Sequence, residues 1–378
     1  MRVLFLSASV GAGHTSAAKA VSCALREIDP SVKTTIVDSY KYAALVVSRV
    51  VSEGYLQMVK TIPQMYGYIY NRAERATEVG PFRTWAHQFT AGNLRALFEK
   101  ERPDVVVCTH AFPSGAMAEY KRMYADAPPV VGIVTDFAVH TFWMHDNVDA
   151  YCVSTDAMRD IMVSRGIEAS RIIVSGIPVD PHFLRPDEPM AALRERLGLP
   201  VDRQIALMMG GGLGFGPLEG MLRAMKDVEA HMAAVVIAGR NKRMEAKVLA
   251  AAESVAYPVR VLRFVDNVYD YMHAADAFVT KPGGLSTAEA LAAEVPLVLC
   301  KPLPGQEERN VKVLTEWGAA VRARTVADLP RVLIEVLTDS ARRRRMIAAA
   351  RRYGRPNAAR EAATVIARLA TAAKEVVA

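Results

Sequence analysis

A histidine follows a glycine turn near the start of the chain, in the segment Ser7-Ala-Ser-Val-Gly-Ala-Gly-His14. Glycines at such a turn let the backbone approach a ligand, and the free N–H groups of a helix N-terminus attract negative charge. An imidazole can accept a hydroxyl proton near neutral pH, so we predict that His14 is a general base. The alternative is a histidine that only hydrogen-bonds at the start of a helix. The full GxGxxG spacing is missing, so the sequence does not support a dinucleotide site.

A second glycine turn, Gly210-Gly-Gly-Leu-Gly-Phe-Gly216, follows an apolar run and precedes Pro217. Backbone N–H groups in such a loop, together with a helix that starts at the proline, can surround a phosphate. No Gly-Lys-Ser/Thr follows, so this is not a Walker A loop. We predict a phosphate-binding loop, and the alternative is a tight turn with a structural role only.

The sequence Lys-Pro-Gly-Gly-Leu-Ser-Thr-Ala-Glu begins at Lys281 and is the most specific stretch of the chain. We expect Gly283 and Gly284 to end a strand, the pair Ser286-Thr287 to cap a helix, and Glu289 to lie in the first turn of that helix. A carboxylate can accept two hydrogen bonds from neighbouring hydroxyl groups such as those of ribose. The alternative is that Glu289 only interacts with the helix dipole.

Further along, Pro302-Leu-Pro-Gly-Gln-Glu-Glu-Arg-Asn310 follows another apolar run. It supplies adjacent amide and carboxylate groups, which can hydrogen-bond to the hydroxyl groups of a sugar. We therefore predict that this stretch contacts a sugar.

Asp136, His140 and His145 lie close together in the sequence and raise the question of a metal site. Their spacing matches no common metal-binding motif. We predict neither a metal site nor a cofactor, and expect these residues to form a polar and aromatic wall of an acceptor cleft.

Short apolar runs alternate with segments of helical periodicity through most of the chain. Such alternation indicates parallel sheets that are covered by helices on both faces. We predict an α/β protein of two doubly wound, Rossmann-like domains. The expected strands of the first domain are 3–7, 34–37, 104–108, 130–135, 150–154 and 171–175. Those of the second domain are 204–209, 233–238, 260–264, 277–280, 297–300 and 319–321.

A proline-rich segment, residues 176–186, interrupts this alternation and is the best candidate for a linker. We therefore place the first domain at residues 1–176 and the second at residues 187–378. Ligands of doubly wound sheets bind outside the carboxyl ends of the strands, so we expect the two domains to face a central cleft.

The formal net charge of +7 favours anionic partners such as phosphorylated ligands, nucleic acid or an acidic membrane face. The cysteines Cys23, Cys108, Cys152 and Cys300 form no CxxC pair, and most lie in or beside apolar runs, so we expect buried free thiols. The N-terminal residues lack the pattern of a signal peptide, and no apolar run is long enough to span a bilayer. We expect a cytoplasmic protein with peripheral membrane contact at most.

No strand is expected between Asp38 and Asp104, where segment 40–90 mixes aromatic, aliphatic and basic residues. This mixture suits a helix that lies in a membrane interface. The alternative is an inserted pair of helices with half-buried tyrosines. The aromatic residues concerned are Tyr40, Tyr42, Tyr55, Tyr66, Tyr68, Tyr70, Phe82, Trp85 and Phe89.

An ordered set of motifs runs through the chain: Ser9-Val-Gly-Ala-Gly-His14 with Ser16-Ala-Ala18, Thr135-Asp-Phe137 with His140, Trp143 and Val148-Asp149, Ser175-Gly-Ile-Pro178, Lys281-Pro-Gly-Gly284 with Glu289-Ala-Leu291, and Lys301-Pro-Leu-Pro-Gly-Gln-Glu307 with Asn310. This set resembles the diacylglycerol glycosyltransferases of glycosyltransferase family 28, which include plant-type monogalactosyldiacylglycerol synthase and bacterial processive diacylglycerol glucosyltransferases. The cell-wall N-acetylglucosaminyltransferase that acts on a lipid-linked muramoyl peptide shares the fold and the glycine–histidine turn. It matches the stretch 135–149 and the Lys-Pro-Gly-Gly-Leu wording less well.

The resemblance implies a GT-B glycosyltransferase that moves a hexose from a UDP-sugar to diacylglycerol, or also to a glycosyl-diacylglycerol, with inversion. His14 would deprotonate the acceptor unless Asp136 shares that role. Segment 40–90 would dock on anionic lipid at the inner face of the cell membrane, and the final helix would return to the first domain. The sequence contains no recognised nucleic-acid-binding motif or basic-aromatic sheet pattern, so we expect no nucleic-acid partner. The implied donor-site residues are Gly211, Gly212 and Gly214 for the diphosphate, Glu289 for the ribose, Phe264 for the uracil, and Gln306, Glu307 and Asn310 for the sugar, with Gly283, Gly284 and Leu285 beside them. The implied acceptor-site residues are Gly13, His110, His140 and Trp143.

One departure concerns Gly210-Gly-Gly-Leu-Gly, which is richer in glycine than in some relatives and so lacks a side chain that could contact phosphate. Three other activities remain open at this point. They are transfer of N-acetylglucosamine to a polyprenyl-linked cell-wall precursor, a nucleotide-sugar 2-epimerase, and lipid binding without catalysis. We favour glucose over galactose as the transferred hexose because the bacterial relatives that the chain resembles use it.

Overall fold

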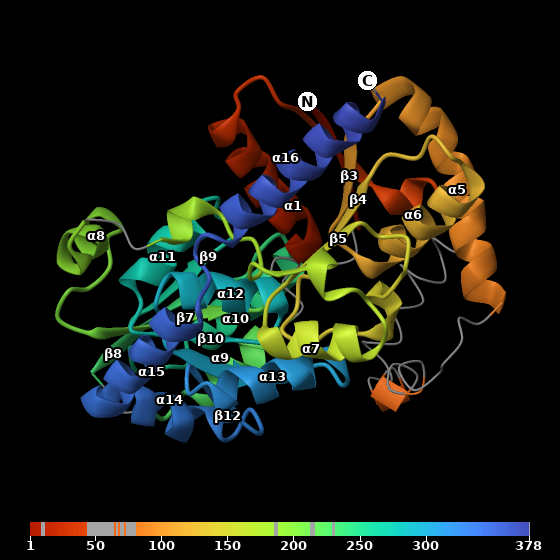
Figure 1. Ribbon diagram of the computed structural model, residues 1–378. Helices are drawn as coiled ribbons and strands as arrows, with labels where there is room; N and C mark the ends of the chain where they lie inside the picture. Colours follow the sequence, from red (N-terminus) through yellow and green to blue (C-terminus); the bar gives the residue numbers. More distant parts are fainter. Residues whose placement is uncertain are drawn as a thin grey trace. The chain divides into compact units, whose positions relative to one another are not determined.

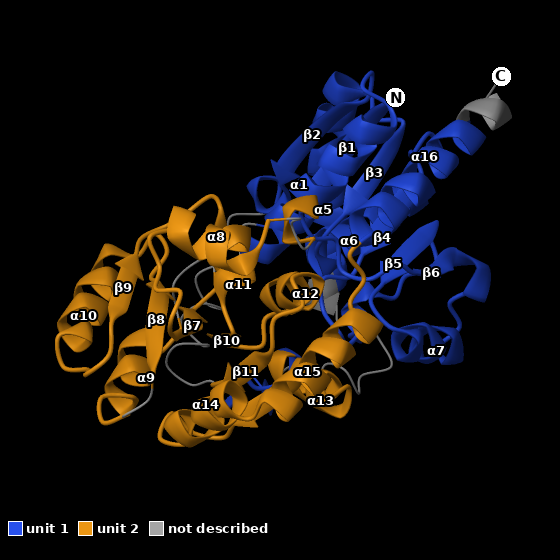
Figure 2. Cartoon of the chain, turned by 90° about the vertical axis from the view of Figure 1, so that its left-hand side faces the viewer, with its two compact units in different colours: residues 1–180, 303–306, 357–378 blue, residues 181–302, 307–356 orange. Residues whose placement is uncertain are grey.

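The computed structural model describes residues 1–8, 12–43, 64–65, 67–68, 72, 81–184, 188–211, 216–228 and 231–377. The chain divides into two compact units, which Figure 2 shows in different colours. Unit 1 consists of Met1–Asp180, Leu303–Gln306 and Asn357–Ala378, and unit 2 of Pro181–Pro302 and Glu307–Pro356. The chain therefore passes from unit 1 to unit 2 within the proline-rich segment 176–186, returns briefly at Leu303–Gln306, and returns again after Pro356.

Unit 1 is built on a six-stranded parallel sheet with the order β2-β1-β3-β4-β5-β6 (Figure 2). Its strands are β1 (Arg2–Ser7), β2 (Lys33–Asp38), β3 (Val105–Cys108), β4 (Val130–Ile133), β5 (Ala150–Val153) and β6 (Ile172–Val174). Its described helices are α1 (Ala12–Ile28), α5 (Pro81–Glu101), α6 (Ala111–Met123), α7 (Asp156–Ser164) and α16 (Ala358–Val377). Its short 3-10 helices are η1 (Ser39–Lys41), η3 (Thr141–Trp143) and η4 (Ala169–Arg171).

Side chains alternate across the first sheet and fill one core on each face. Val3 and Phe5 of β1 pack with residues of α1 and α16, including Val21 and Ile366. The residues between them on β1, such as Leu4, pack with α5, α6 and α7 in the second core. The last helix of the chain, α16, thus lies beside the first helix, α1, and covers the sheet of unit 1 (Figure 1).

Unit 2 is built on a second six-stranded parallel sheet, with the order β12-β11-β10-β7-β8-β9. Its strands are β7 (Gln204–Met209), β8 (Met232–Ile237), β9 (Val259–Leu262), β10 (Ala277–Thr280), β11 (Leu297–Cys300) and β12 (Ala320–Ala323). Its helices are α8 (Met190–Arg196), α9 (Leu218–Ala224), α10 (Lys242–Ala252), α11 (Val268–Ala274), α12 (Gly284–Ala292), α13 (Gln306–Glu316), α14 (Leu329–Thr338) and α15 (Ser340–Tyr353), preceded by the 3-10 helix η5 (Pro181–Phe183). All twelve predicted strands are confirmed, with ends that differ by a few residues.

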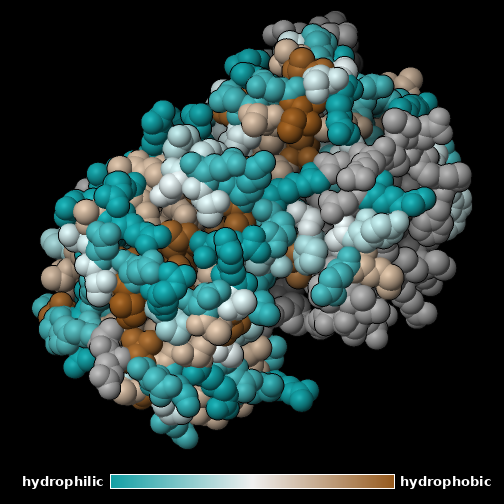
Figure 3. Space-filling view, turned by 90° about the horizontal axis from the view of Figure 1, so that it is seen from below, coloured by the Kyte–Doolittle hydropathy of each residue, from teal (hydrophilic) through white to brown (hydrophobic). Residues whose placement is uncertain are grey.

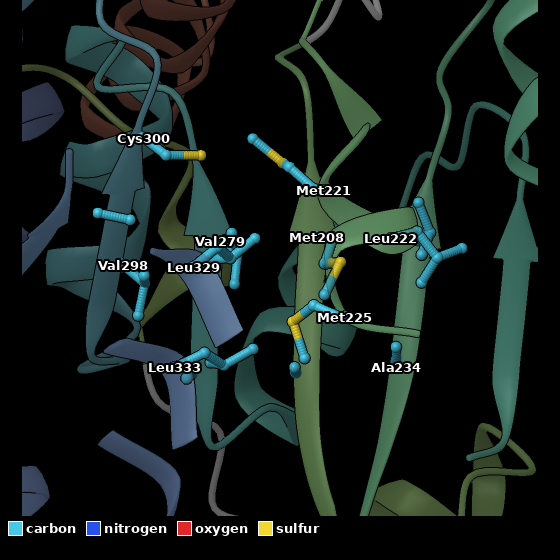
Figure 4. Packing of buried hydrophobic residues seen from close by; sticks show 14 of the residues in the cluster. Met208, Met221, Leu222, Met225, Ala234, Val279, Val298, Cys300, Leu329 and Leu333 are labelled. Atoms are coloured by element: carbon cyan, nitrogen blue, oxygen red, sulfur yellow. The ribbon is translucent and has the colours of Figure 1, made fainter. Parts of the chain in front are cut away.

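One core of unit 2 is rich in methionine. Met208 of β7 packs in one cluster with Met221 of α9 and Met225, which follows α9. Leu329 and Leu333 of α14 belong to the same cluster (Figure 4). Unbranched methionine side chains fill irregular gaps between a twisted sheet and its helices. The cysteines Cys108, Cys152 and Cys300 are buried free thiols, as predicted, whereas Cys23 is exposed.

Both sheets contain a point where the strand order reverses. In unit 1 the chain runs from β1 outward to β2 and then returns to β3 on the other side of β1. In unit 2 it runs from β7 to β8 and β9 and then returns to β10 beside β7. Ligands of doubly wound folds bind outside the carboxyl ends of the strands at these points. The residues that follow β1, β3, β7 and β10 are therefore the first place to look for a site.

No described helix is long and apolar enough to cross a bilayer. On the face drawn in Figure 3, hydrophilic side chains surround smaller hydrophobic patches.

Candidate functional site

The first candidate site lies in unit 1, at the carboxyl ends of three neighbouring strands. His14 is in the first turn of α1, after β1, whereas Thr109 follows β3 and Thr135 follows β4. The Nδ1 atom of His14 lies 2.9 Å from the carbonyl oxygen of Thr109. It also lies 2.9 Å from the hydroxyl oxygen of Thr135. The reversal of strand order thus brings Thr109 and Thr135, each more than ninety positions after His14 in the sequence, against the imidazole of His14.

These contacts assign the tautomer of His14. A carbonyl oxygen can only accept a hydrogen bond, so Nδ1 carries the proton and the lone pair is left on Nε2. Burial lowers the pKa of His14 from 6.5 to about 4, although the hydrogen bond to Thr109 acts in the opposite direction. The ring is therefore neutral near pH 7 and has Nε2 in the form that accepts a proton, which is the state that a general base requires.

A second histidine, His110, lies edge-on to His14, with 4.7 Å between the ring centroids. Its Nδ1 atom accepts a hydrogen bond from the backbone N–H of Phe112 at 3.1 Å and so caps α6. The proton of this ring is therefore on Nε2. Burial and the neighbouring His14 hold the pKa of His110 well below its usual value. The site thus contains two neutral imidazoles with opposite tautomers.

Asp136, the other predicted catalytic residue, is buried directly after Thr135. Ser154 donates a hydrogen bond to its backbone oxygen at 2.7 Å. Its carboxylate accepts a hydrogen bond from the side-chain amide of Gln306, which is grouped with unit 1. Asp136 is thus fixed next to Thr135, which contacts the base.

The residues predicted to bind the acceptor differ in their surroundings. Gly13 precedes His14 in the first turn of α1. His140 is buried and caps η3 by accepting a hydrogen bond from the N–H of Phe142 at 3.1 Å. Trp143 is buried in the core beneath β4 and β5. The structure gives His140 and Trp143 structural contacts, and their contact with an acceptor stays a prediction.

The second candidate site lies in unit 2 and begins at the glycine loop after β7. A Cβ atom on Gly210 would lie 2.7 Å from the backbone N of Gly216, and one on Gly216 would lie 2.5 Å from the Cα of Gly210. Two of the glycines are therefore required because the two ends of the loop touch. Gly211 has a φ of 81°, a conformation that favours glycine. Gly212 and Gly214 lie outside the described residues.

The Lys-Pro-Gly-Gly segment differs from its predicted local structure. The strand β10 ends at Thr280 rather than at the glycines, and Gly283 is the N-cap of α12. Thr287 does not cap the helix; its hydroxyl group donates to the carbonyl oxygens of Gly283 and Gly284 at 2.8 and 3.0 Å. Glu289 therefore lies in the second turn of α12 rather than the first.

Gly283 leaves open space at the start of α12. Its φ of −70° suits any residue, and a Cβ atom built there would meet nothing within 4 Å. The free N–H groups at this helix end are thus open to an anion. Gly284 and Leu285 form the first turn behind this opening.

The stretch after β11 contributes its side chains to the same site. The Nζ atom of Lys281 lies 2.6 Å from Oε1 of Glu307. Asn310 is fully buried and donates from its amide to the carbonyl oxygen of Pro282 at 3.0 Å. The start of α13 is therefore attached to the Lys-Pro-Gly-Gly segment by an ion pair and a hydrogen bond.

Phe264 follows β9 and is 44% exposed. The guanidinium carbon of Arg240, which follows β8, lies 4.1 Å from the centroid of the Phe264 ring. This exposed cation–π pair offers a flat surface at the carboxyl ends of the two strands.

Among the described residues, no group of histidine, cysteine and acidic side chains is arranged to hold a metal ion.

The sequence did not single out Thr109, Lys281 or Arg240 as site residues. Thr109 acts through its backbone carbonyl oxygen, which carries no side-chain signal. Lys281 stands in a recognised motif, but only the fold reveals its ion pair with Glu307.

Two family models match the two halves of the chain in order. A family model described as monogalactosyldiacylglycerol (MGDG) synthase matches residues 14–179, and one described as glycosyl transferases group 1 matches residues 190–353. The processive diacylglycerol beta-glucosyltransferase of Bacillus mycoides strain KBAB4 is 30% identical over 322 residues, which cover 85% of this chain and 81% of that protein.

Solved structures resemble the chain in fold. MurG of Acinetobacter baumannii superposes with a TM-score of 0.62 at 16% identity, covering 97% of this chain and 99% of that one. A UDP-GlcNAc 2-epimerase from Neisseria meningitidis bound to UDP-GlcNAc gives a TM-score of 0.64 at 12% identity, covering 97% and 100%. The fold, two parallel doubly wound sheets, is thus the GT-B fold predicted from the sequence.

Proposed function

Because the chain belongs to the diacylglycerol glucosyltransferase family, we propose that it transfers a hexose from a UDP-sugar to diacylglycerol and inverts the anomeric centre. The chain is a glycosyltransferase. The donor, the acceptor and the stereochemistry are the proposal.

The observation that carries this proposal is the state of His14. Its Nδ1–H is bound to the carbonyl oxygen of Thr109, and burial keeps the ring neutral. Nε2 can therefore take the proton of the acceptor hydroxyl group while the hydroxyl oxygen attacks C1 of the sugar. The bond between C1 and the diphosphate breaks with its electron pair on UDP, and attack from the opposite face inverts C1. Asp136, fixed beside Thr135, lies on the same edge of the sheet and completes the acceptor side.

The donor would bind in unit 2. The loop after β7 and the open N-terminus of α12 present backbone N–H groups for a diphosphate. Glu289 would hold the ribose and the exposed ring of Phe264 the uracil, while Gln306, Glu307 and Asn310 are assigned to the sugar. Glucose is the proposed hexose, because the curated relative is named for it.

A lipid acceptor requires contact with a membrane, and the described part of segment 40–90 supports such contact. Trp85 and Phe89 of α5 are 45% and 43% exposed, and their ring centroids lie 5.8 Å apart. Exposed aromatic side chains one helical turn apart suit insertion at the lipid–water boundary. We infer a peripheral location at the inner face of the cell membrane. The remainder of segment 40–90 lies largely outside the described residues.

The test is an assay with UDP-[14C]glucose or UDP-[14C]galactose and liposomes that contain diacylglycerol. We expect labelled glycolipid with at least one donor, and a decrease of about two to four decades in turnover for His14→Ala. His231→Ala, at an exposed surface histidine, is the matched control. Absence of labelled lipid with both donors would refute the proposal, and turnover of UDP-sugar in lipid-free buffer would point to an epimerase.

A further inference from the structure

The ion pair between Lys281 and Glu307 lies inside unit 2, between the end of β10 and the start of α13. Its Nζ–Oε1 distance is 2.6 Å, and the side chains are 28% and 9% exposed, respectively. Glu307 is thus buried beneath the lysine, whereas Lys281 keeps a surface that a ligand can reach. A buried carboxylate requires such a partner, because an unpaired charge in this position is costly.

Lys281 also borders the glycine loop. A Cβ atom on Gly211 would lie 3.2 Å from Cε of Lys281. The neighbouring strand ends are held in register by the hydrogen bond from the Thr280 hydroxyl group to the carbonyl oxygen of Met209, at 2.9 Å. The lysine side chain therefore lies against bare backbone, at the point where the loop leaves β7.

Lys281 thus touches two groups with different proposed ligands. Gly211 belongs to the loop that is assigned to the diphosphate, and Glu307 to the residues that are assigned to the sugar. Under these two assignments, the Lys281 ammonium group lies where the sugar joins the diphosphate, beside the bond that breaks. Gly210 and Gly211 offer no side chain of their own to the phosphates.

We propose that Lys281 is a catalytic residue that binds the β-phosphate of the donor through its ammonium group and stabilises the departing UDP. This role rests on the proposed function. As the bond between C1 and the β-phosphate oxygen breaks, the electron pair stays on that oxygen, and the ammonium group neutralises the added charge without giving up a proton. The acceptor oxygen forms the new bond to C1, and its proton goes to His14. Glu307 is a positioning residue that holds Lys281 against the loop.

Binding of UDP, UMP and uridine to the full chain tests this role by titration calorimetry. For Lys281→Met we expect the Kd for UDP to rise about tenfold to a hundredfold, while the values for UMP and uridine stay within about twofold. Lys281→Arg should recover part of the loss. Lys312→Met, which removes an exposed lysine from α13, the helix that carries Glu307, is the matched control and should bind UDP as the unmodified chain does.

A second variant separates catalysis from a structural role. Lys281→Met removes the ion-pair partner of the buried Glu307 carboxylate, so the double variant Lys281→Met/Glu307→Gln removes both charges. If the lysine only neutralised Glu307, the double variant would regain UDP affinity, and the proposal would be overturned. We expect the double variant to melt near the temperature of the unmodified chain but to bind UDP as weakly as Lys281→Met. An unmodified chain that fails to bind UDP would refute the proposed function itself, whereas equal UDP binding by Lys281→Met would refute only the role of Lys281.

Discussion

The Nδ1 atom of His14 lies 2.9 Å from the carbonyl oxygen of Thr109, and this contact decides which nitrogen of the ring can act. The carbonyl oxygen holds the proton on Nδ1 and leaves Nε2 to accept one. The two residues follow β1 and β3, the neighbouring strands between which the strand order of the sheet reverses. The topology of unit 1 therefore fixes the chemical state of the candidate base.

The pH dependence of activity should reflect the lowered pKa of His14. A general base is active when neutral, so protonation below its pKa of about 4 removes activity. We expect kcat/KM to be level between about pH 5.5 and 7.5 and to fall only as the pH approaches 4. A loss of half the activity near the ordinary histidine pKa of about 6.5 would contradict this assignment.

Acid also affects the folded state, so this measurement needs a control. The pKa of His14 and that of His110 are both lower in the folded chain than in an unfolded one. The unfolded state therefore takes up more protons as the pH falls from about 6.5 toward 4, and stability decreases in that window. The melting temperature should be recorded at each pH, and rates should be compared only where the chain is folded.

Thr135→Val tests the support of the base. The substitution keeps the shape of the side chain but removes the hydroxyl group that lies 2.9 Å from Nδ1 of His14. We expect kcat to fall about tenfold with little change in the Kd for UDP, because one hydrogen bond that orients the base is lost. Thr135→Ser keeps the hydroxyl group and should restore most of the rate. Equal rates for Thr135→Val and the unmodified chain would exclude Thr135 from the mechanism.

Gly283→Ala separates the needs of a ligand from those of the fold. The φ of −70° and the open space around the missing Cβ predict an unchanged melting temperature. The added methyl group would occupy the opening at the N-terminus of α12, so we expect the Kd for UDP to rise severalfold. Gly92→Ala is the control: it also has nothing within 4 Å, and it lies inside α5. There alanine should increase stability by about 0.5–1 kcal/mol and leave UDP binding unchanged. Unchanged UDP affinity in Gly283→Ala would indicate that the donor does not approach this helix end.

Trp85→Ser and Phe89→Ser test the proposed membrane contact. Each aromatic side chain that enters the lipid boundary contributes about 1.5–3 kcal/mol, so the double variant should bind anionic liposomes at least tenfold more weakly in a flotation assay. Ile161→Ser and Leu249→Ser replace hydrophobic side chains that are 44% and 48% exposed on other helices, and they serve as controls. Equal losses in both pairs of variants would mean that α5 is not the docking surface.

The fold was predictable because its signals are local. Buried parallel strands such as β3, with the sequence Val-Val-Val-Cys, read as continuous apolar runs, and glycine-rich turns mark where β1 and β7 end. The start of α12 was predicted wrongly, because Ser286 and Thr287 are good capping residues by type. In the structure the helix begins earlier, and Thr287 turns its hydroxyl group back to the carbonyl oxygens of the first turn.

The details of the site depend on contacts between distant parts of the chain and could not be read from the sequence. The meeting of Gly210 and Gly216 explains two glycines that a phosphate-binding loop alone would not require. The pairing of Lys281 with Glu307 joins two motifs that the sequence treats separately. His140 and Trp143 belong to a recognisable motif, yet the structure places one in a helix cap and the other in a core.

The most direct measurement of the central claim is the NMR spectrum of the lipid product made from UDP-α-[1-13C]glucose, or from the galactose donor, and diacylglycerol. We predict a labelled anomeric carbon with the coupling constant of a β-glycoside, formed by the unmodified chain and almost absent with His14→Ala. An α-glycoside would contradict a single displacement with His14 as the base. No labelled lipid from either donor would contradict glycosyl transfer to diacylglycerol altogether.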